Sequence, residues 1–147
     1  MFRRFFIPVI LILLIISPAI NAKEIEGINM PEALEAGQTK LMLNGAGSRT
    51  KFFIDVYVGG LYLKEKSQDP KAIIEDDAPM AVRLHITSSL ITSEKMEKAW
   101  REGFENATKG NTRAIDSQVE KFIAVFKEKI EENDIFDLIY TPGKGLE

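Results

Sequence analysis

The side chains able to do chemistry in this chain are few, and they exclude several classes of site. None of the 147 residues is a cysteine, which excludes disulfides, thiolate nucleophiles and thiolate metal ligands. His85 is the only histidine, and one imidazole makes no metal site without further ligands. Gly45 and Gly47 lack the third glycine of a dinucleotide-binding loop. The sequence therefore predicts no metal ion, no cofactor and no catalytic residue.

Arg49 has the clearest potential for binding. A guanidinium stays positively charged at any working pH, and at the mouth of a pocket it stabilises a bound oxyanion. Arg49 lies two residues after Gly47, the end of the glycine-rich residues 44–47, which predict a turn. In the alternative reading, Arg49 is a turn residue that caps nearby carbonyls or pairs with Asp55. We take Arg49 as the hypothetical anchor of an anionic group.

Residues 49–63 carry the strongest strand signal. Apolar side chains alternate through this range, which is typical of a half-buried strand. Arg49 and Tyr57 have the same parity, so one strand would place them on one face. Eight residues of straight strand would separate them by about 26 Å, too far to share one carboxylate. A bend between them is then needed for a joint site, and otherwise Tyr57 is a packing aromatic.

The remaining patterns position these residues in an α+β domain. Two amphipathic helices are predicted, one with Thr92 or Ser93 as its N-cap and one over residues 112–130. Strands before and after them favour helices on one face of an antiparallel sheet. The other predicted elements are an edge strand and loop over 23–39, strands over 40–43, 80–87 and 135–140, a short helix over 71–75 and a turn over 141–143.

The N-terminus predicts export to the periplasm or the cell exterior. Arg3 and Arg4 precede an apolar run over residues 5–16, and small residues follow up to Ala22. This order is typical of a signal peptide, and the run is too short to span a bilayer. The alternative is an uncleaved N-terminal anchor. We therefore predict a signal peptide over residues 1–22 and one domain over residues 23–147.

The charge of that domain limits its partners. Residues 1–22 hold two arginines and no acid, so the net charge of −3 becomes −5 once they are removed. An acidic domain lacks the basic patch that nucleic acids and anionic membrane surfaces require. We expect no nucleic acid as partner, and contact with a membrane only through the N-terminal segment if it stays uncleaved.

Three stretches resemble the chalcone isomerase family, and within it an exported bacterial chalcone isomerase-like branch. They are LNGAGSRTKFFIDVYVGGLYL from Leu43, SEKMEKAW from Ser93 and QVEKFIAVFKE from Gln118. The resemblance implies an open-faced β-sandwich, in which helices cover a large curved antiparallel sheet. Family members continue with a strand and helices past the point where this sequence stops, so we expect the domain to be truncated at its C-terminus.

The resemblance also implies a site. Arg49 matches the arginine that holds the substrate phenolate in the plant enzymes, but Tyr57, Thr92 and Ala99 stand where those enzymes have a threonine, a tyrosine and an asparagine. Fatty-acid-binding members pair the arginine with a tyrosine, a role open to Tyr57. The leading hypothesis is non-catalytic binding of an acidic apolar small molecule such as a fatty acid. The alternatives are an intramolecular lyase (an isomerase) acting on an enone or phenolic substrate, and a structural or partner-binding module.

Overall fold

The computed structural model describes residues 22–147. The predicted signal peptide lies outside the described residues apart from Ala22, so export stays a prediction. Within the described range, each helix falls short of the length and apolar content needed to cross a bilayer. Both buried clusters and all the strands of the two sheets come from this range, so residues 22–147 possess a hydrophobic core of their own.

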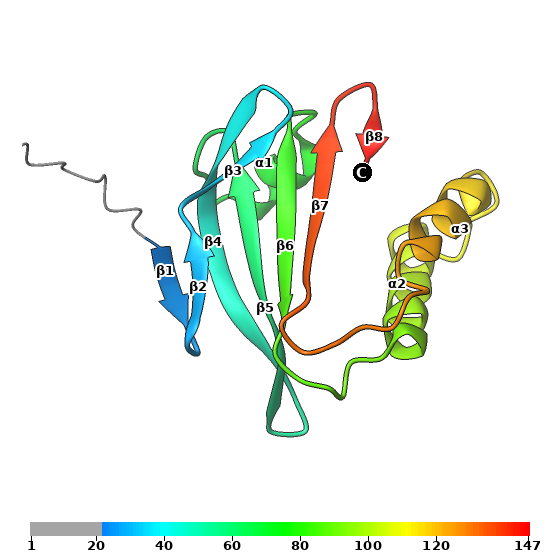
Figure 1. The fold of residues 1–147 in the computed structure, drawn as a ribbon. Coiled ribbons are helices and arrows are strands. Elements are labelled where there is room, and N and C mark those ends of the chain that lie inside the picture. Colours follow the sequence, from blue (N-terminus) through cyan, green and yellow to red (C-terminus); the bar gives the residue numbers. More distant parts are fainter. Residues whose placement is uncertain (1–21) are drawn as a thin grey trace, which may run out of the picture.

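A six-stranded antiparallel sheet forms the body of the fold, and a small two-stranded sheet precedes it (Figure 1). Each strand of the large sheet pairs with the next strand in the sequence, as far as β8. The strands are β1 (Ala22–Ile25) and β2 (Ile28–Pro31) in the small sheet, and β3 (Ala33–Ala36), β4 (Thr39–Lys51), β5 (Ile54–Leu63), β6 (Met80–Ile86), β7 (Ile135–Thr141) and β8 (Gly145–Leu146) in the large one.

Three helices complete the fold: α1 (Pro70–Glu75), α2 (Ser93–Ala107) and α3 (Asp116–Ala124). Asp69 caps α1, because its carboxylate accepts from the backbone N–H groups of Lys71 and Ala72. Thr92 caps α2 in the same way, accepting from Lys95 N–H at 3.3 Å. The predicted architecture is therefore confirmed: the protein is an α+β domain with a curled antiparallel sheet and helices on one side.

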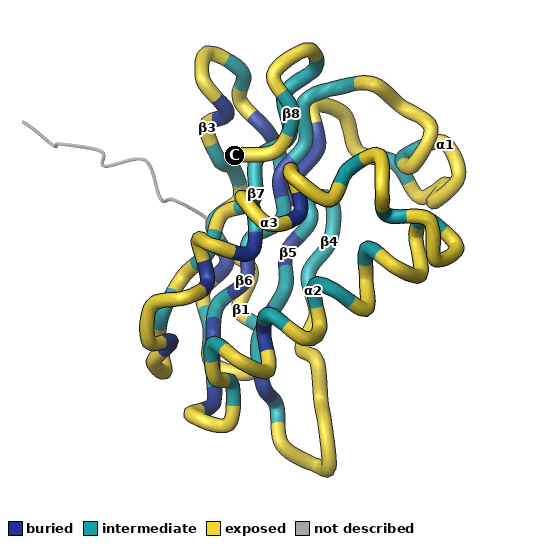
Figure 2. The backbone as a smooth tube through the Cα atoms, turned by 90° about the vertical axis from the view of Figure 1, so that its right-hand side faces the viewer, coloured by how far each residue is buried: buried dark blue, intermediate teal, exposed yellow. Residues whose placement is uncertain are grey.

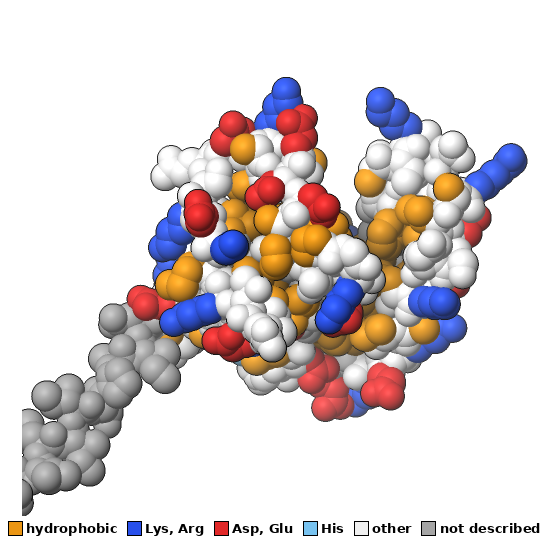
Figure 3. All heavy atoms as spheres, turned by 90° about the horizontal axis from the view of Figure 1, so that it is seen from above, with side chains coloured by type: hydrophobic (Ala, Val, Ile, Leu, Met, Phe, Trp, Pro, Cys, Tyr) orange, Lys and Arg blue, Asp and Glu red, His pale blue; other side chains and the backbone are white. Residues whose placement is uncertain are grey.

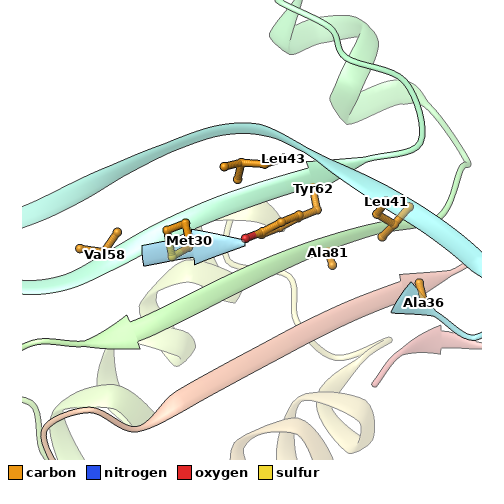
Figure 4. Packing of buried hydrophobic residues seen from close by; sticks show 7 residues of the cluster. All are labelled: Met30, Ala36, Leu41, Leu43, Val58, Tyr62 and Ala81. Atoms are coloured by element: carbon orange, nitrogen blue, oxygen red, sulfur yellow. The ribbon is translucent and has the colours of Figure 1, made fainter. Parts of the chain in front are cut away.

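One buried cluster lies between the large sheet and the β1–β2 hairpin. Figure 4 shows Tyr62 pointing toward Met30, and both side chains are fully buried. The Tyr62 hydroxyl donates to the carbonyl of Pro31 at 3.0 Å, which joins β5 to the end of β2. Burial raises the pKa of the Tyr62 phenol above its ordinary value, so this donor stays protonated. The cluster comprises Met30, Ala36, Leu41, Leu43, Val58, Tyr62 and Ala81.

The second buried cluster, here called the helix cluster, joins the helices to the opposite face of the sheet. It is built on Ile86, Met96, Phe126 and Ile130. Phe126 is central, because its ring lies 5.5 Å from that of Trp100 on α2 and 5.1 Å from that of Phe136 on β7. Partly buried residues packed against the cluster are Tyr57, Ile91, Trp100, Phe122, Phe136 and Leu138.

The prediction of one strand over residues 49–63 is wrong. The range is a hairpin: β4 continues to Lys51, a two-residue turn follows at Phe52 and Phe53, and β5 begins at Ile54. Both phenylalanines have positive φ, 50° and 65°, as a two-residue hairpin turn requires. Phenylalanine is not a usual turn residue, so the residue types at these two positions do not predict a turn.

Two further predictions, a turn over residues 44–47 and an edge strand with a loop over residues 23–39, also need correction. Residues 44–47 are not a turn but the middle of β4, which bulges at Asn44 where the register shifts. The Asn44 side chain compensates for the bulge by bonding both the N–H and the carbonyl of Ser67, at 2.8 and 2.9 Å. Residues 23–39 form β1, β2 and β3 instead of one edge strand and a loop.

The second predicted helix is shorter than its apolar periodicity suggests. It was expected over residues 112–130, and α3 covers only Asp116–Ala124. Its end tightens into bonds between residues three apart, such as Phe126 N–H to the Ile123 carbonyl at 2.9 Å. Phe126 and Ile130 are nevertheless buried, so they keep their predicted core role without helical backbone.

Candidate functional site

The hairpin brings Arg49 and Tyr57 side by side. They are direct partners across β4 and β5, which overturns the separation of about 26 Å expected from a single straight strand. Residues directly opposite on an antiparallel pair have Cβ atoms about 5 Å apart and share one face of the sheet. The bend that a joint site needs is therefore present, and it is the Phe52–Phe53 turn.

Tyr57 identifies the face that the pair occupies. Its ring packs against the helix cluster, so it points to the side of the sheet that carries α2 and α3. Arg49, as its direct partner, lies on that same face. Ser48 and Val58, one step further along the two strands, lie on the opposite face, where Val58 belongs to the Tyr62 cluster.

A strip without side chains adjoins the Arg49–Tyr57 pair. Gly47 and Gly59 are the next partners on this face, and Gly45 opposite Leu61 follows them. A methyl group built on Gly45 or Gly47 would meet no atom within 4 Å. At Gly59 it would meet only Tyr57 and Leu84, at ordinary contact distances of 3.7 and 3.8 Å. We call Gly45, Gly47 and Gly59 the glycine strip, and the space next to Gly45 and Gly47 is open.

The space between the sheet and the helices is hollowed and apolar. Figure 3 shows a deep hollow between the two parts of the molecule, with hydrophobic side chains along its walls. In Figure 2, α2 passes in front of β4 and β5. Half-buried apolar residues that share the strip's face are Met42, Leu61, Met80, Val82, Phe136 and Leu138.

Arg49 itself is exposed. Among the described residues it makes no ion pair and no side-chain hydrogen bond, so the pairing with Asp55 considered from the sequence is absent; the Asp55 carboxylate accepts from the Thr50 hydroxyl at 2.6 Å instead. The guanidinium is therefore free to meet an anion. It also lies at the open end of the strip, nearest to the turn, and not in an enclosed pocket.

Two other cavities lie away from this pair. One, of about 640 Å³, lies between residues 89–94 before and at the start of α2 and residues 127–132 after α3. The other, of about 510 Å³, lies between residues 63–67 after β5 and residues 72–80 around the end of α1. Neither Arg49 nor Tyr57 lines either of these two cavities.

The two positions that depart from the plant enzymes do not join the pair. Thr92 uses its hydroxyl oxygen as the N-cap of α2. Ala99 is exposed on α2 and brings no polar group. The hydrogen-bonding groups that the resemblance associates with ring closure are therefore missing at both positions.

The other polar candidates are not assembled into a site either. The Nε2 atom of His85 and the Nε1 atom of Trp100 are buried without a hydrogen-bond partner among the described residues. His85 lies on the sheet face opposite the helices, next to Val58 in the register. The described part of the chain holds no group of three or more side chains able to ligate a metal ion.

Sequence reasoning missed the glycine strip. Gly45 and Gly47 stand at a spacing of two, as do Gly47 and Arg49, which is the period of one strand face. That spacing could have predicted one strand face lined by glycines. Glycines are more common in turns than in strands, so the range was interpreted as a turn.

Comparisons with known proteins agree with this fold. A family model described as chalcone isomerase-like matches residues 22–147. No curated protein sequence gives a significant match. Among solved structures, the crystal structure of an Arabidopsis thaliana fatty-acid binding protein matches with a TM-score of 0.64 and 24% identity, over 82% of this chain and 72% of that one. At this identity the likeness shows the fold.

Proposed function

Because the chain belongs to the chalcone isomerase-like family, we propose that residues 22–147 bind an acidic apolar small molecule, such as a fatty acid, in the cleft between the sheet and the helices. The binding is non-catalytic. Arg49 anchors the acidic group, Tyr57 donates a hydrogen bond to it, and the apolar tail lies along the glycine strip.

One observation carries this proposal: a free guanidinium and a phenol are direct strand partners at one end of a side-chain-free strip. A charge-assisted hydrogen bond from Arg49 orients the ligand. The sheet face from Arg49 past the glycine strip to Met42 is about 20 Å long, and its apolar residues supply contact area for a long tail. The fold neighbour from Arabidopsis thaliana, a fatty-acid binding protein, supports this choice of ligand.

We expect Arg49→Ala to weaken oleate binding by about 10- to 100-fold, since a hydrogen bond to a charged group contributes about 1.5–3 kcal/mol. Tyr57→Phe should weaken it less, by about threefold to tenfold. The measurement is titration of residues 22–147 with oleate, monitored by the fluorescence of Trp100, the only tryptophan.

Arg113→Ala is the matched control, because Arg113 is an exposed arginine outside the sheet. Methyl oleate, which lacks the carboxylate, should bind wild type and Arg49→Ala equally. Equal oleate affinity of Arg49→Ala and wild type would remove Arg49 from the site and contradict the proposal.

A structural or partner-binding module is the second candidate. Arg49 is exposed, and both described cavities lie elsewhere, which favours this alternative. Absence of saturable oleate binding in the titration would select it. The lyase hypothesis has less support. Thr92 uses its hydroxyl oxygen to cap α2, and Ala99 has no polar side chain to offer a substrate.

Export to the periplasm or the cell exterior belongs to the same proposal, as does membership of an exported branch of the family. The support is the order of charge, apolar run and small residues before Ala22. When the full chain is expressed in a Gram-negative host, the intact mass of the protein in the periplasmic fraction should correspond to a chain without residues 1–22. A full-length mass in the cytosolic fraction would contradict export.

A further inference from the structure

The tip of the β4–β5 hairpin is an exposed apolar surface. Phe53 is fully exposed and Phe52 is 83% exposed, while the adjacent Ile54 is 45% exposed. No other pair of neighbouring aromatic residues in the described chain lies open to solvent in this way. We call Lys51–Ile54 the hairpin tip.

The turn itself does not require these side chains. Lys51 pairs with Ile54, so the turn has two residues, and both have positive φ. Asn-Gly is the preferred pair for such a turn, whereas positive φ is unfavourable for a bulky residue such as phenylalanine. Phe52 and Phe53 therefore destabilise the fold in two ways: their backbone conformation is unfavourable, and their apolar rings are exposed to water. Neither ring makes a core contact that would offset this.

The hairpin tip stands clear of the rest of the sheet. The last register pair between β5 and β6 is Tyr57 with Ile86, and the hydrogen bond nearest to the turn between β5 and the following chain is from the Thr87 hydroxyl to the Asp55 carbonyl, at 2.9 Å. Figure 1 shows the hairpin extending past β6 and β7, and Figure 2 shows its end as exposed backbone. The tip can therefore meet a flat surface before any other part of the sheet does.

Two cations lie just behind the aromatic residues. The Lys51 ammonium is 5.8 Å from the centre of the Phe52 ring, and Arg49 lies two residues, about 7 Å, further back. The nearby carboxylate of Asp55 is engaged by the Thr50 hydroxyl. Apolar rings at the end, with one cation beside them and a second further back, match the order of acyl chains and phosphates at a bilayer surface.

We propose that the hairpin tip inserts into the surface of a phospholipid bilayer, with Phe52, Phe53 and Ile54 among the acyl chains and Lys51 and Arg49 at the phosphates. The acidic charge of the whole domain disfavours adsorption to anionic surfaces, so the apolar side chains must supply most of the affinity. The Arg49–Tyr57 pair would then lie at the level of the headgroups. Insertion goes beyond the proposed ligand binding and does not depend on it.

The test replaces Phe52→Asn and Phe53→Gly together, using residues 22–147 and vesicles of phosphatidylcholine. Wild type should float with the vesicles, and the double variant should partition at least about tenfold less, since two aromatic rings are lost. Its melting temperature should be equal or higher, because Asn-Gly relieves the turn. Ile74→Gln removes an equally exposed aliphatic residue from α1 and should float like wild type.

A local probe reports on the tip directly. With Phe53→Trp, lipids brominated in their acyl chains should quench the new emission while leaving the partly buried Trp100 of wild type, which packs on the helix cluster, unquenched. Quenching should persist in 0.5 M salt if apolar insertion dominates, because salt at this strength screens exposed charges. Flotation of the double variant equal to that of wild type, absence of wild-type flotation, or binding abolished by salt would each overturn the proposal. No oleate is present, so failure here leaves the ligand titration unaffected.

Discussion

Replacing Phe126 with alanine should lower the free energy of unfolding by about 3–5 kcal/mol, the usual cost of truncating a fully buried phenylalanine. Phe126 is 1% exposed, and its ring lies within 5.5 Å of those of Trp100, Phe122 and Phe136. The loss is large because the backbone after α3 holds the ring at a fixed place between helices and sheet, so the cavity cannot collapse easily.

The same substitution should loosen the helices more than the strands. Phe126 bridges Trp100 on α2 to Phe136 on β7, whereas the Tyr62 cluster lies on the other face of the sheet and keeps its contacts. Amide hydrogen exchange of Phe126→Ala should therefore show lost protection in α2 and α3 before β4 and β5.

Urea unfolding followed by circular dichroism gives the change in stability. Val125→Ala is the matched control: Val125 is the preceding residue, 64% exposed, and its truncation should cost less than about 0.5 kcal/mol. A Phe126→Ala variant as stable as Val125→Ala would mean that the helices are held to the sheet by other contacts.

Much of the fold was predictable because its helices and β6 have clean periodicity and caps. Thr92, one of the two residues predicted as the N-cap of the long helix, caps α2 in the structure, and Asp69 caps α1 in the same way. The family resemblance, carried by residues 43–63 above all, supplied the curled sheet that periodicity alone does not specify.

The hairpin was unpredictable for a physical reason. Phe52 and Phe53 have high strand propensity and continue the alternation of their neighbours, so no local signal marks the turn. The pairing of the two strands places the turn: with a turn there, β5 pairs with β4 from Met42 to Lys51 and buries Leu43 against Tyr62. Long-range pairing outweighs the local preference of two residues.

The site was half predictable for the same reason. Arg49 was predicted as the anchor of an anionic group, which stays a prediction, but its position opposite Tyr57 follows only from the turn. The prediction of α3 up to residue 130 failed because the periodicity of buried residues outlasts the helix; Ile130 is buried from irregular backbone.

Gly60→Val should destabilise the fold by about 3 kcal/mol, the upper part of the usual cost of overpacking. Gly59 and Gly60 are neighbours in sequence but face opposite sides of the sheet. A Cβ atom on Gly60 would lie 2.5 Å from Met30 Cε, 3.1 Å from Tyr62 Cε2 and 3.3 Å from Leu43 Cδ1. Met30 and Tyr62 are both fully buried, so the end of the Met30 side chain has little free space to move into.

Gly47→Val separates this steric effect from any general need for glycine in the strands. Gly47 lies in β4 with no atom within 4 Å of a built Cβ, so valine should be tolerated and should even favour the strand. Thermal unfolding should therefore rank Gly60→Val well below wild type and Gly47→Val close to it. Equal melting temperatures for the two variants would contradict the assigned faces.

Gly47→Val also tests the proposed position of the ligand tail. If the glycine strip holds the tail, this stable variant must weaken oleate binding, because the valine side chain projects into the space that the tail occupies.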